Sequence, residues 1–471
     1  MRLSLARLRR SPALAAFLSF LLPGLGQVWA GAVMRGVLLI VPIVILVGGI
    51  AGFVIGQGSA RFLGIALQPG VLLTILAIDA VLLVYRVAAI VDAYLLGRPG
   101  RRMAAPRTRR AASVSVLVLL LAVTVAMHGW VGVVTYKSYD LVANVFVPVS
   151  TSTPQPTAPT ATPSQGPTFS PTPTPVPVPA WAENGRLDVV LIGGDAGPGR
   201  RSLRTDSMTL VSVEVATGKA KMFGIPRNLI NVPLPPETAS AFACGCFPDL
   251  INALFEYAET HPNIFPGADD QRGYIALQST LSHFLGVPID GMLVVDLNGF
   301  VRLIDALGGL DITTPEAVYD SKYPLEDGSG YVKLYIPAGP HHFNGHEALQ
   351  YARSRHQDDD YHRMDRQQLT LLALRRQINP CSLVPRLPEL LDIGKDSLWT
   401  DIAISDLPDL LALAQRVDAG KIKRAAFNPP EIPEYINAAA VATVQKMVAD
   451  AFKSGTKTSP TPTPSEPPSP C

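Results

Sequence analysis

Long apolar stretches dominate the first third of the chain and are absent from the rest. Residues 37–57, 70–94 and 113–136 are each apolar throughout most of their length. A helix needs about 20 such residues to cross a bilayer core ~30 Å thick. A fourth stretch, residues 12–31, is apolar but is interrupted by a PGLGQ run. We therefore predict a membrane region at 1–136 with three spanning helices, and 12–31 either lies in the interface, re-enters the membrane or crosses it.

Arginines flank these stretches unevenly. Four lie in the first ten residues, and six lie between Arg98 and Arg110. Positively charged loops remain in the cytoplasm, so both segments are expected there, with an even number of crossings between them. Residues 113–136 would then carry the remainder out of the cell. The predicted localisation is the cell membrane, multi-pass, with the C-terminal domain extracytoplasmic.

Two charged residues lie inside the second apolar stretch. Asp79 and Arg86 are two helical turns apart on one face. Charges at this depth are costly and are often functional. The alternative is a structural pair that faces the neighbouring helices.

The apolar region ends in a stretch rich in proline, threonine and serine. Residues 137–184 contain a long run of these residues, which cannot bury a core and favours an extended chain. Residues 454–471 repeat this composition and are predicted to be a disordered tail. The first segment is therefore predicted to be a linker that holds a domain away from the membrane.

Between linker and tail, the periodicity alternates between that of strands and that of helices. Strands are predicted at 186–194, 208–215, 219–225, 291–297, 332–337 and 422–428. Helices are predicted at 250–260, 270–286, 298–307, 344–354, 361–378, 404–417 and 433–453. Interleaved strands and helices favour an α/β layered domain. The net charge is only +2, so the composition predicts no nucleic-acid partner.

Acidic and basic residues follow or precede three of the predicted strands. Asp195 follows the first strand, Arg204 and Asp206 open the second, and Arg227 closes the third. Neighbouring strand ends would bring these side chains to one edge of a sheet. Magnesium is bound by one or two carboxylates together with phosphate oxygens, and arginine grips phosphate bidentately. The pattern predicts a magnesium-bound pyrophosphate site, although each residue taken alone favours ordinary surface ion pairing.

A second charged segment is YARSRHQDDDYHRMDRQQ, residues 351–368. Its candidate anion-binding residues are Arg353, Arg355, Arg363, Arg366 and Gln367. Arginines at a helix start oppose the macrodipole, whereas the helix start itself favours anions. A bound phosphate would reconcile the two. A solvated charged loop is the alternative.

The histidines are possible metal ligands, and the cysteines are possible disulfide partners. His342 and His346 have zinc-like spacing, but no HExxH motif is present, and Asn344 is predicted to cap the following helix. Cys244 and Cys246 are too close in the sequence for an easy mutual disulfide. We expect one of them to pair with Cys381, since disulfides are permitted outside the cell. The alternative is that these cysteines are free and buried.

Several motifs occur together in one order. They are RTDSMTLVSV, KMFGIPRN, INALFEYA, LGVPIDGMLVVDLNGFVRLIDALGGLDI, FNGHEALQYARSRH and YHRMDRQQ. With these motifs, residues 185–380 resemble the catalytic domain of the LytR–CpsA–Psr family of cell-wall glycopolymer ligases. The resemblance implies a layered αβα domain with a central mixed sheet, behind α-helical transmembrane spans. Residues 381–453 are predicted to be a C-terminal α/β extension.

The resemblance also implies a reaction. The donor would be a polyprenyl pyrophosphate-linked glycan, and its glycan phosphate would pass to a peptidoglycan hydroxyl or another wall acceptor with Mg²⁺. The implied metal ligands are Asp195 and Asp206. The implied catalytic residues are Arg204, Arg227, Arg353 and Arg355, and the implied substrate-binding residues are Arg363, Arg366 and Gln367. The apolar runs GMLVVDL, FVRLIDAL and LTLLALRR would line the prenyl site, or they would be ordinary core.

The chain departs from the family pattern at two places. Asn228 stands where the family often has an aspartate, and Leu250 stands where it often has a basic residue. Two other functions therefore remain as alternatives. One is a polyprenyl pyrophosphate phosphatase with water as acceptor, and the other is a non-catalytic lipid-binding regulator or wall-binding module.

Overall fold

The computed structural model describes residues 11–98, 107–147, 180–194, 204–269, 271–325, 329–355, 360–378 and 384–453. The chain divides into two compact units. The membrane unit comprises Met1–Ala143 with Leu407–Ala412, and the outer unit comprises Asn144–Asp406 with Leu413–Cys471. Each unit has its own hydrophobic core.

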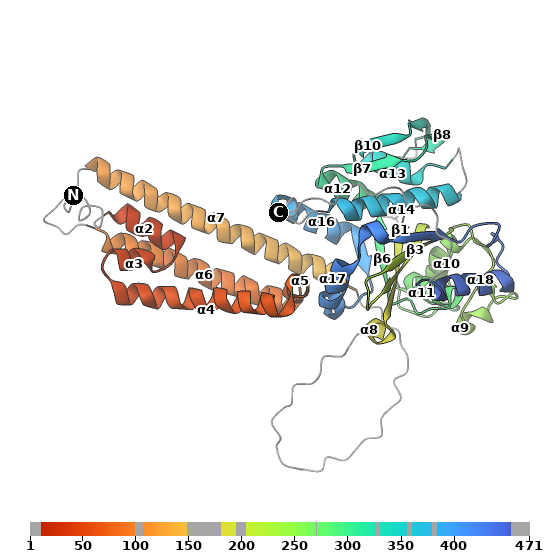
Figure 1. The fold of residues 1–471 in the computed structure, drawn as a ribbon, viewed down its shortest axis with the longest axis horizontal. Helices are drawn as coiled ribbons and strands as arrows, with labels where there is room; N and C mark the ends of the chain where they lie inside the picture. The colour runs from red at the N-terminus through yellow and green to blue at the C-terminus, as the bar shows by residue number, and fades with distance from the viewer. Residues whose placement is uncertain are drawn as a thin grey trace, which may run out of the picture. The chain divides into compact units, whose positions relative to one another are not determined.

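The membrane unit is helical (Figure 1). Its helices are α2 (Pro12–Leu21), α3 (Leu25–Trp29), α4 (Val33–Gln57), α5 (Ser59–Ala66), α6 (Pro69–Leu96) and α7 (Arg107–Val145). Three of them, α4, α6 and α7, are long and apolar enough to cross a membrane. The interrupted stretch 12–31 forms the two short helices α2 and α3. They meet at Gly24, where a side chain would collide with the carbonyl of Gly36 in α4.

Polar side chains inside the membrane unit bond from helix to helix. Asp79 of α6 lies 2.7 Å from Nδ1 of His128 in α7. Arg86 of α6 donates to the carbonyl of Phe20 in α2 at 2.7 Å. Both charged residues therefore face neighbouring helices, as the structural alternative for this pair expects. Desolvated polar groups of this kind hold membrane helices together.

The outer unit is built on a six-stranded sheet with strand order β11-β6-β1-β2-β3-β12. These strands are β1 (Arg186–Gly194), β2 (Thr205–Glu214), β3 (Ala220–Ile225), β6 (Gly291–Asp296), β11 (Leu398–Thr400) and β12 (Lys423–Ala426). β2 pairs antiparallel with β1 and β3, whereas β6 and β12 run parallel to β1 and β3. The sheet is therefore mixed, and the predicted α/β fold class is confirmed. The sequence predicts a C-terminal extension at 381–453, and this region supplies both edge strands.

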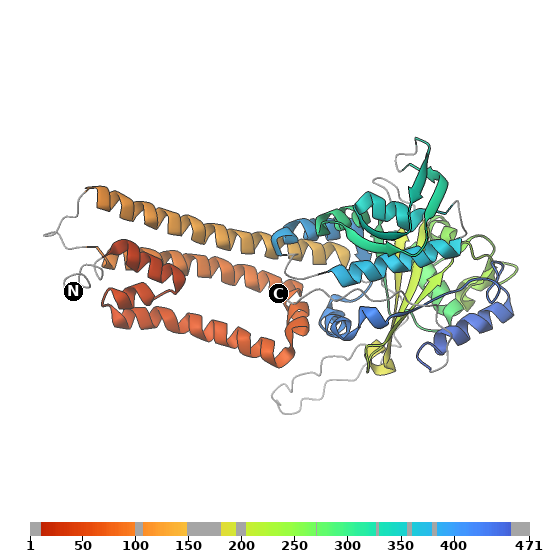
Figure 2. The ribbon, with the colours of Figure 1, turned by 45° about the horizontal axis from the view of Figure 1, so that its top comes forward.

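Helices cover both faces of this sheet (Figures 1 and 2). The helices α10 (Leu254–Thr260), α11 (Arg272–Leu285) and α18 (Ala438–Ala449) lie on one face. The helices α12 (Leu297–Leu307), α13 (Gly345–Arg353) and α14 (Asp360–Gln377) lie on the other, with α16 (Leu387–Ser397) beside α12. Figure 2 shows α14 running across the strands. The architecture is the predicted αβα sandwich.

The two faces of the sheet differ in how tightly they are sealed. On the α11 face, alternate residues such as Val190, Leu210 and Met292 are fully buried. On the α12–α14 face, the intervening residues Leu191 and Leu293 remain half-buried. Successive residues of a strand point to opposite faces of the sheet. The named residues on the α12–α14 face are therefore less completely buried than those on the α11 face. The helices on the second side do not exclude solvent from the apolar strands beneath them.

Smaller strand pairs flank α13. They are β7 (Leu310–Thr314) with β10 (Gly339–Phe343) and β8 (Val318–Pro324) with β9 (Tyr331–Ile336). A second core of Ile304, Leu310, Ala348 and Tyr351 joins them to α12 and α13. The remaining elements are α8 (Ala180–Asn184), β4 (Val232–Pro233), α9 (Pro236–Ala239), β5 (Cys246–Phe247) and α17 (Leu407–Arg416).

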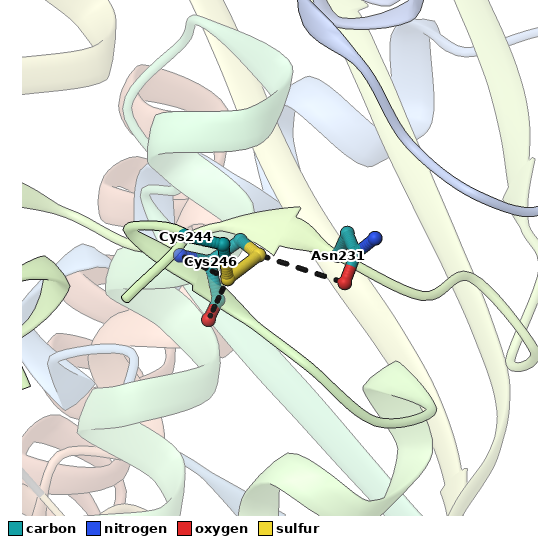
Figure 3. Close-up of a disulfide and its surroundings, with 3 residues drawn as sticks. All are labelled: Asn231, Cys244 and Cys246. Atoms are coloured by element: carbon teal, nitrogen blue, oxygen red, sulfur yellow. Dashed lines mark hydrogen bonds between the residues drawn. A yellow bond between two sulfur atoms is a disulfide. The ribbon is translucent and has the colours of Figure 1, made fainter. Parts of the chain in front are cut away.

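The disulfide prediction is wrong. Cys244 bonds to Cys246, with the two Cα atoms 5.1 Å apart, inside the range for this bond (Figure 3). Gly245 between them has φ +63°, a left-handed conformation that turns the chain and lets the two side chains converge. Cys381, the predicted partner, lies outside the described residues.

Candidate functional site

One edge of the sheet collects several of the predicted site residues. Gly194 at the end of β1 pairs with Thr205 at the start of β2, and Met208 pairs with Ile225 near the end of β3. The parallel partners β6 and β12 also end on this side. The predicted arrangement, in which neighbouring strand ends share an edge, is therefore correct for β1, β2 and β3. We call this edge the site edge.

Asp206 is the centre of the contacts at the site edge. Arg227 Nη1 lies 2.5 Å from Asp206 Oδ1, and Asn252 Nδ2 donates to the same oxygen at 3.3 Å. Arg363, from α14, donates to the backbone carbonyl of Asp206 at 3.4 Å. Arg227 and Asp206 retain 21% and 33% of their side-chain exposure, so the pair is open to a ligand. Three segments thus converge on Asp206: two contact its carboxylate, and α14 contacts its backbone carbonyl.

α14 adds a second polar group beside Asp206. Gln367 Oε1 accepts a hydrogen bond from Ser207 Oγ at 3.0 Å. Arg363 and Gln367 are four residues apart and share a helix face. α14 lies close to the sheet because β3 carries a glycine beneath Met364 and Gln368: a Cβ at Gly224 would lie 3.2 Å from Met364 Sδ. The absence of a side chain at Gly224 sets how near α14 comes to Asp206.

Arg366 is as buried as Arg363 but makes different contacts. Its side chain donates from Nε to the carbonyl of Tyr351 at 3.2 Å and from Nη2 to the carbonyl of Ser354. These carbonyls end α13, where no further helical N–H reaches them. Arg366 therefore ties α14 to the segment that carries Arg353 and Arg355. We interpret it as a positioning residue.

The remaining predicted arginines lie around this segment and at the start of β2. Arg353 is the half-buried last residue of α13, and Arg355 is exposed, with its backbone N–H donating to Asp320 Oδ2 at 3.0 Å. Arg204 is also exposed, and its Nε lies 3.9 Å from Glu256 Oε2. Long exposed arginines of this kind can fold over a bound anion. Asp195 lies outside the described residues.

The predicted helix cap is confirmed, and His342 has a structural role. Asn344 Oδ1 accepts from the N–H of Glu347, whose carboxylate in turn accepts from the N–H of Asn344. His342 bonds through Nδ1 to Asp311 at 2.7 Å and through Nε2 to the Gly308 carbonyl at 3.0 Å. The hydrogen bond that His342 donates to the Asp311 carboxylate raises the pKa of His342. Both ring nitrogens are thus engaged in fixing a turn.

A cation fits at Asp206 on chemical grounds. Among the residues that the structure describes, both side-chain hydrogen bonds to this carboxylate fall on Oδ1, so Oδ2 can serve a hard cation. Magnesium needs only one or two protein carboxylates when substrate phosphates complete its shell. Within the described ranges, no group of three or more His, Cys, Asp or Glu residues gathers at one point. A cation here would therefore depend on the substrate for most of its ligands.

Two residues at the site edge were missed from the sequence. Asn252 belongs to the INALFEYA motif but is a neutral side chain on a short 3₁₀ turn, and charge patterns do not detect it. Ser207 is part of RTDS, yet its partner Gln367 lies 160 positions away. Only their position in the family motifs could have identified them.

These contacts lie within the region that matches a family model. The model described as the LytR_cpsA_psr family matches residues 152–458. The chain belongs to the LytR–CpsA–Psr family. The match includes the linker and residues 381–453, so both edge strands of the sheet fall inside the family region.

Curated relatives share part of this region. The chain is 29% identical over 205 residues to the polyisoprenyl-teichoic acid–peptidoglycan teichoic acid transferase TagV of Bacillus subtilis, covering 43% of this chain and 46% of that protein. It is 25% identical over 226 residues to the corresponding TagU of Halalkalibacterium halodurans, covering 48% and 64%. The chain thus spans about half to two thirds of these relatives.

One solved structure aligns with part of this chain. The crystal structure of B. subtilis TagV aligns with 57% of this chain and 98% of its own length. The TM-score is 0.41 and the sequence identity is 24%.

Proposed function

We propose that this LytR–CpsA–Psr protein is a phosphotransferase that moves a glycopolymer phosphate from a polyprenyl pyrophosphate carrier to a hydroxyl of peptidoglycan. The observation that carries the proposal is the convergence of Asp206, Arg227, Arg363 and Gln367 at one edge of the sheet. The names of the two relatives, TagV and TagU, describe this class of reaction. The finer identity of donor and acceptor is part of the proposal.

The diphosphate would lie against the guanidinium groups of Arg227 and Arg363. Phosphoryl transfer requires little covalent chemistry from the protein, so catalysis is mostly positioning and charge stabilisation. Arg227 is fixed by Asp206 at 2.5 Å before substrate arrives, which lowers the reorganisation needed in the transition state. Arg353 and Arg355 are held near by Arg366 and would add donors to the leaving phosphate.

Asp206 would also hold Mg²⁺ through Oδ2. When bound, Mg²⁺ neutralises charge on the phosphate oxygens. Asn252 keeps Asp206 oriented by donating to Oδ1 at 3.3 Å. The protein residues thereby place one carboxylate oxygen toward the diphosphate and the other toward Arg227.

The half-sealed face of the sheet offers a place for the prenyl chain. Leu191 and Leu293 on the strands are half-buried, as are Phe300 on α12 and Leu371 on α14. An apolar layer that its own helices do not close can gain stability from a hydrocarbon chain, since burial contributes roughly 25 cal/mol per Å². The lipid end of the donor would lie between the layers with its diphosphate at the site edge.

The membrane unit fits a lipid-linked donor. Its helices α4, α6 and α7 are long and apolar enough to cross a bilayer. We propose a multi-pass protein whose outer unit is extracytoplasmic, where peptidoglycan is found. The bilayer, the lipid-linked glycan and the wall are then its partners.

Reconstituted full-length protein provides the test. It would be supplied with Mg²⁺, a polyprenyl pyrophosphate-linked glycan and peptidoglycan. Glycan phosphate recovered on peptidoglycan supports the proposal. Free glycan phosphate without transfer would identify a phosphatase instead. Tight donor binding with neither product would identify a lipid-binding regulator, and the proposal would be rejected.

A further inference from the structure

A polar pocket lies on the other side of α14 from Arg363 and Gln367. Its volume is about 370 Å³. It is lined by Tyr361, His362 and Asp365 from α14 and by Arg424, Ala426 and Asn428 from β12 and the turn after it. Ligand sites in proteins span about 300–1,000 Å³, so one sugar ring fits this pocket. We call it the β12 pocket.

The β12 pocket lies along the same edge of the sheet as Asp206. β12 pairs in parallel with β3, with Ala426 opposite Gly224, and β2 lies on the far side of β3. Two strand spacings separate β2 from β12, which is about 10 Å. A single sugar unit attached to a phosphate can bridge this separation. β12 is also the last strand of the sheet, so a polymer can continue past it into solvent.

The charges in the β12 pocket are already balanced. Arg424 Nη1 lies 3.7 Å from Asp365 Oδ1, and the Arg424 side chain is only 10% exposed. Because so little of this guanidinium side chain is exposed, it offers a phosphate less contact than the more open Arg227 does. The pair instead presents donors and acceptors side by side, which is the pattern that suits hydroxyl groups.

Asn428 is the side chain most available to a ligand. It is half-buried, and its one hydrogen bond in the described part of the chain is made by its backbone carbonyl, which accepts from Ile432 at 3.0 Å. Its amide can both donate and accept. Pro429 and Ala426 supply small apolar surface beside it. A ring with polar edges and apolar faces matches this combination.

We propose that the β12 pocket binds a sugar unit of a glycan that takes part in the transfer. The inference rests on the proposed function, because a glycan reaches this pocket only if the neighbouring site binds its diphosphate or transfers phosphate to it. The same chemistry could belong to the first sugar of the donor glycan or to the peptidoglycan acceptor. It assigns a role to residues 423–429, which lie in the C-terminal region.

The test uses full-length protein in nanodiscs and the substitutions Asn428→Ala and Asp365→Asn. Glu431→Ala is the matched control, because Glu431 is exposed nearby and does not line the pocket. Three probes are titrated: an N-acetylglucosamine–N-acetylmuramic acid disaccharide, a glycan-bearing polyprenyl pyrophosphate, and a glycan-free polyprenyl pyrophosphate. Loss of one hydrogen bond should weaken the sugar-bearing ligand about three- to tenfold. The glycan-free lipid should bind unchanged, which also shows that the variants fold.

The outcomes separate the two sources and the two proposals. Weaker disaccharide binding assigns the pocket to the acceptor, and weaker binding of the glycan-bearing lipid alone assigns it to the donor. Unchanged affinity for both sugar ligands in both variants overturns the inference. If wild-type protein transfers nothing to peptidoglycan but Asn428→Ala still weakens sugar binding, the proposed function fails while the sugar site stands.

Discussion

Substitution of Arg366 can show whether this residue positions α13 and α14 or binds phosphate. The sequence predicts that it binds substrate, whereas the structure directs its side chain to the carbonyls of Tyr351 and Ser354. Arg366→Met removes the hydrogen bonds to these two carbonyls. The Tyr351 carbonyl keeps a hydrogen bond from Ser354 Oγ at 3.2 Å, whereas the Ser354 carbonyl loses the guanidinium donor. Each hydrogen bond from a charged donor contributes about 1.5–3 kcal/mol. Relief of the buried charge offsets part of this, so the free energy of unfolding should fall by about 2–4 kcal/mol.

The measurement is thermal unfolding of the outer unit in the full-length protein without substrate. For a unit of this size, 1 kcal/mol corresponds to about 2–4 °C, so we expect Tm to fall by about 5–10 °C. Hydrogen exchange should rise at residues 351–355. Arg366→Lys retains the charge but not the forked geometry, and it should show a smaller loss.

A phosphate-binding role makes the opposite prediction. An arginine in the first turns of a helix opposes the macrodipole, so its removal would leave the substrate-free protein equally stable or slightly more stable. If Arg366→Met melts within about 1 °C of wild type and loses only donor affinity, our interpretation of Arg366 is incorrect.

Three further substitutions test the site and the sheet. Arg227→Ala should lower kcat of transfer by about 10²–10³-fold, because a preorganised cation is lost. Circular dichroism should show that the fold is intact. Unaltered turnover would exclude Arg227 from the site. Gly224→Ala should lift α14 by a few tenths of an ångström, because the new Cβ meets Met364 Sδ at 3.2 Å; we expect transfer to fall about two- to tenfold, and a fully active variant would show that the spacing is not critical. Burial raises the pKa of Asp290 to about 6, above its unfolded value of about 4. The folded state then binds more protons, so this contribution is present below about pH 4 and is lost as pH rises through 6. The free energy of unfolding, measured with urea, should therefore fall between about pH 4 and 6, and Asp290→Asn should make this fall smaller by about 1 kcal/mol after allowance for solvent screening. Transfer at neutral pH should stay unchanged. An equal fall in the wild type and the variant would contradict the assignment.

The sequence was informative where local patterns carried the information. The strand at 186–194 and the helix at 361–378 correspond closely to β1 and α14, because an unbroken apolar run and a periodic one each specify a single element. The sequence also predicted the site edge, because Asp206 and Arg227 lie next to the ends of predicted strands. Their contact at 2.5 Å depends only on antiparallel pairing of neighbouring strands.

Other features depend on contacts that local patterns cannot encode. The short strand β11 was not predicted, because three residues carry no usable periodicity and its pairing partner lies about 100 positions earlier. Arg366 and Arg363 look alike in sequence, yet only the fold of α13 directs one to backbone carbonyls and the other to Asp206. The disulfide prediction failed because it ignored the conformational freedom of Gly245.

The origin of the two edge strands has a consequence for biogenesis. β12 pairs Lys423 with Lys221, and β11 pairs Leu398 with Val295, so both outer strands are synthesised long after the strands they protect. Until they arrive, β3 and β6 present unpaired backbone groups, which invite association with other chains. Pairings across such sequence separations also form slowly. A nascent chain interrupted before residue 423 would therefore be an aggregation hazard, because β3 would still lack the strand that covers it.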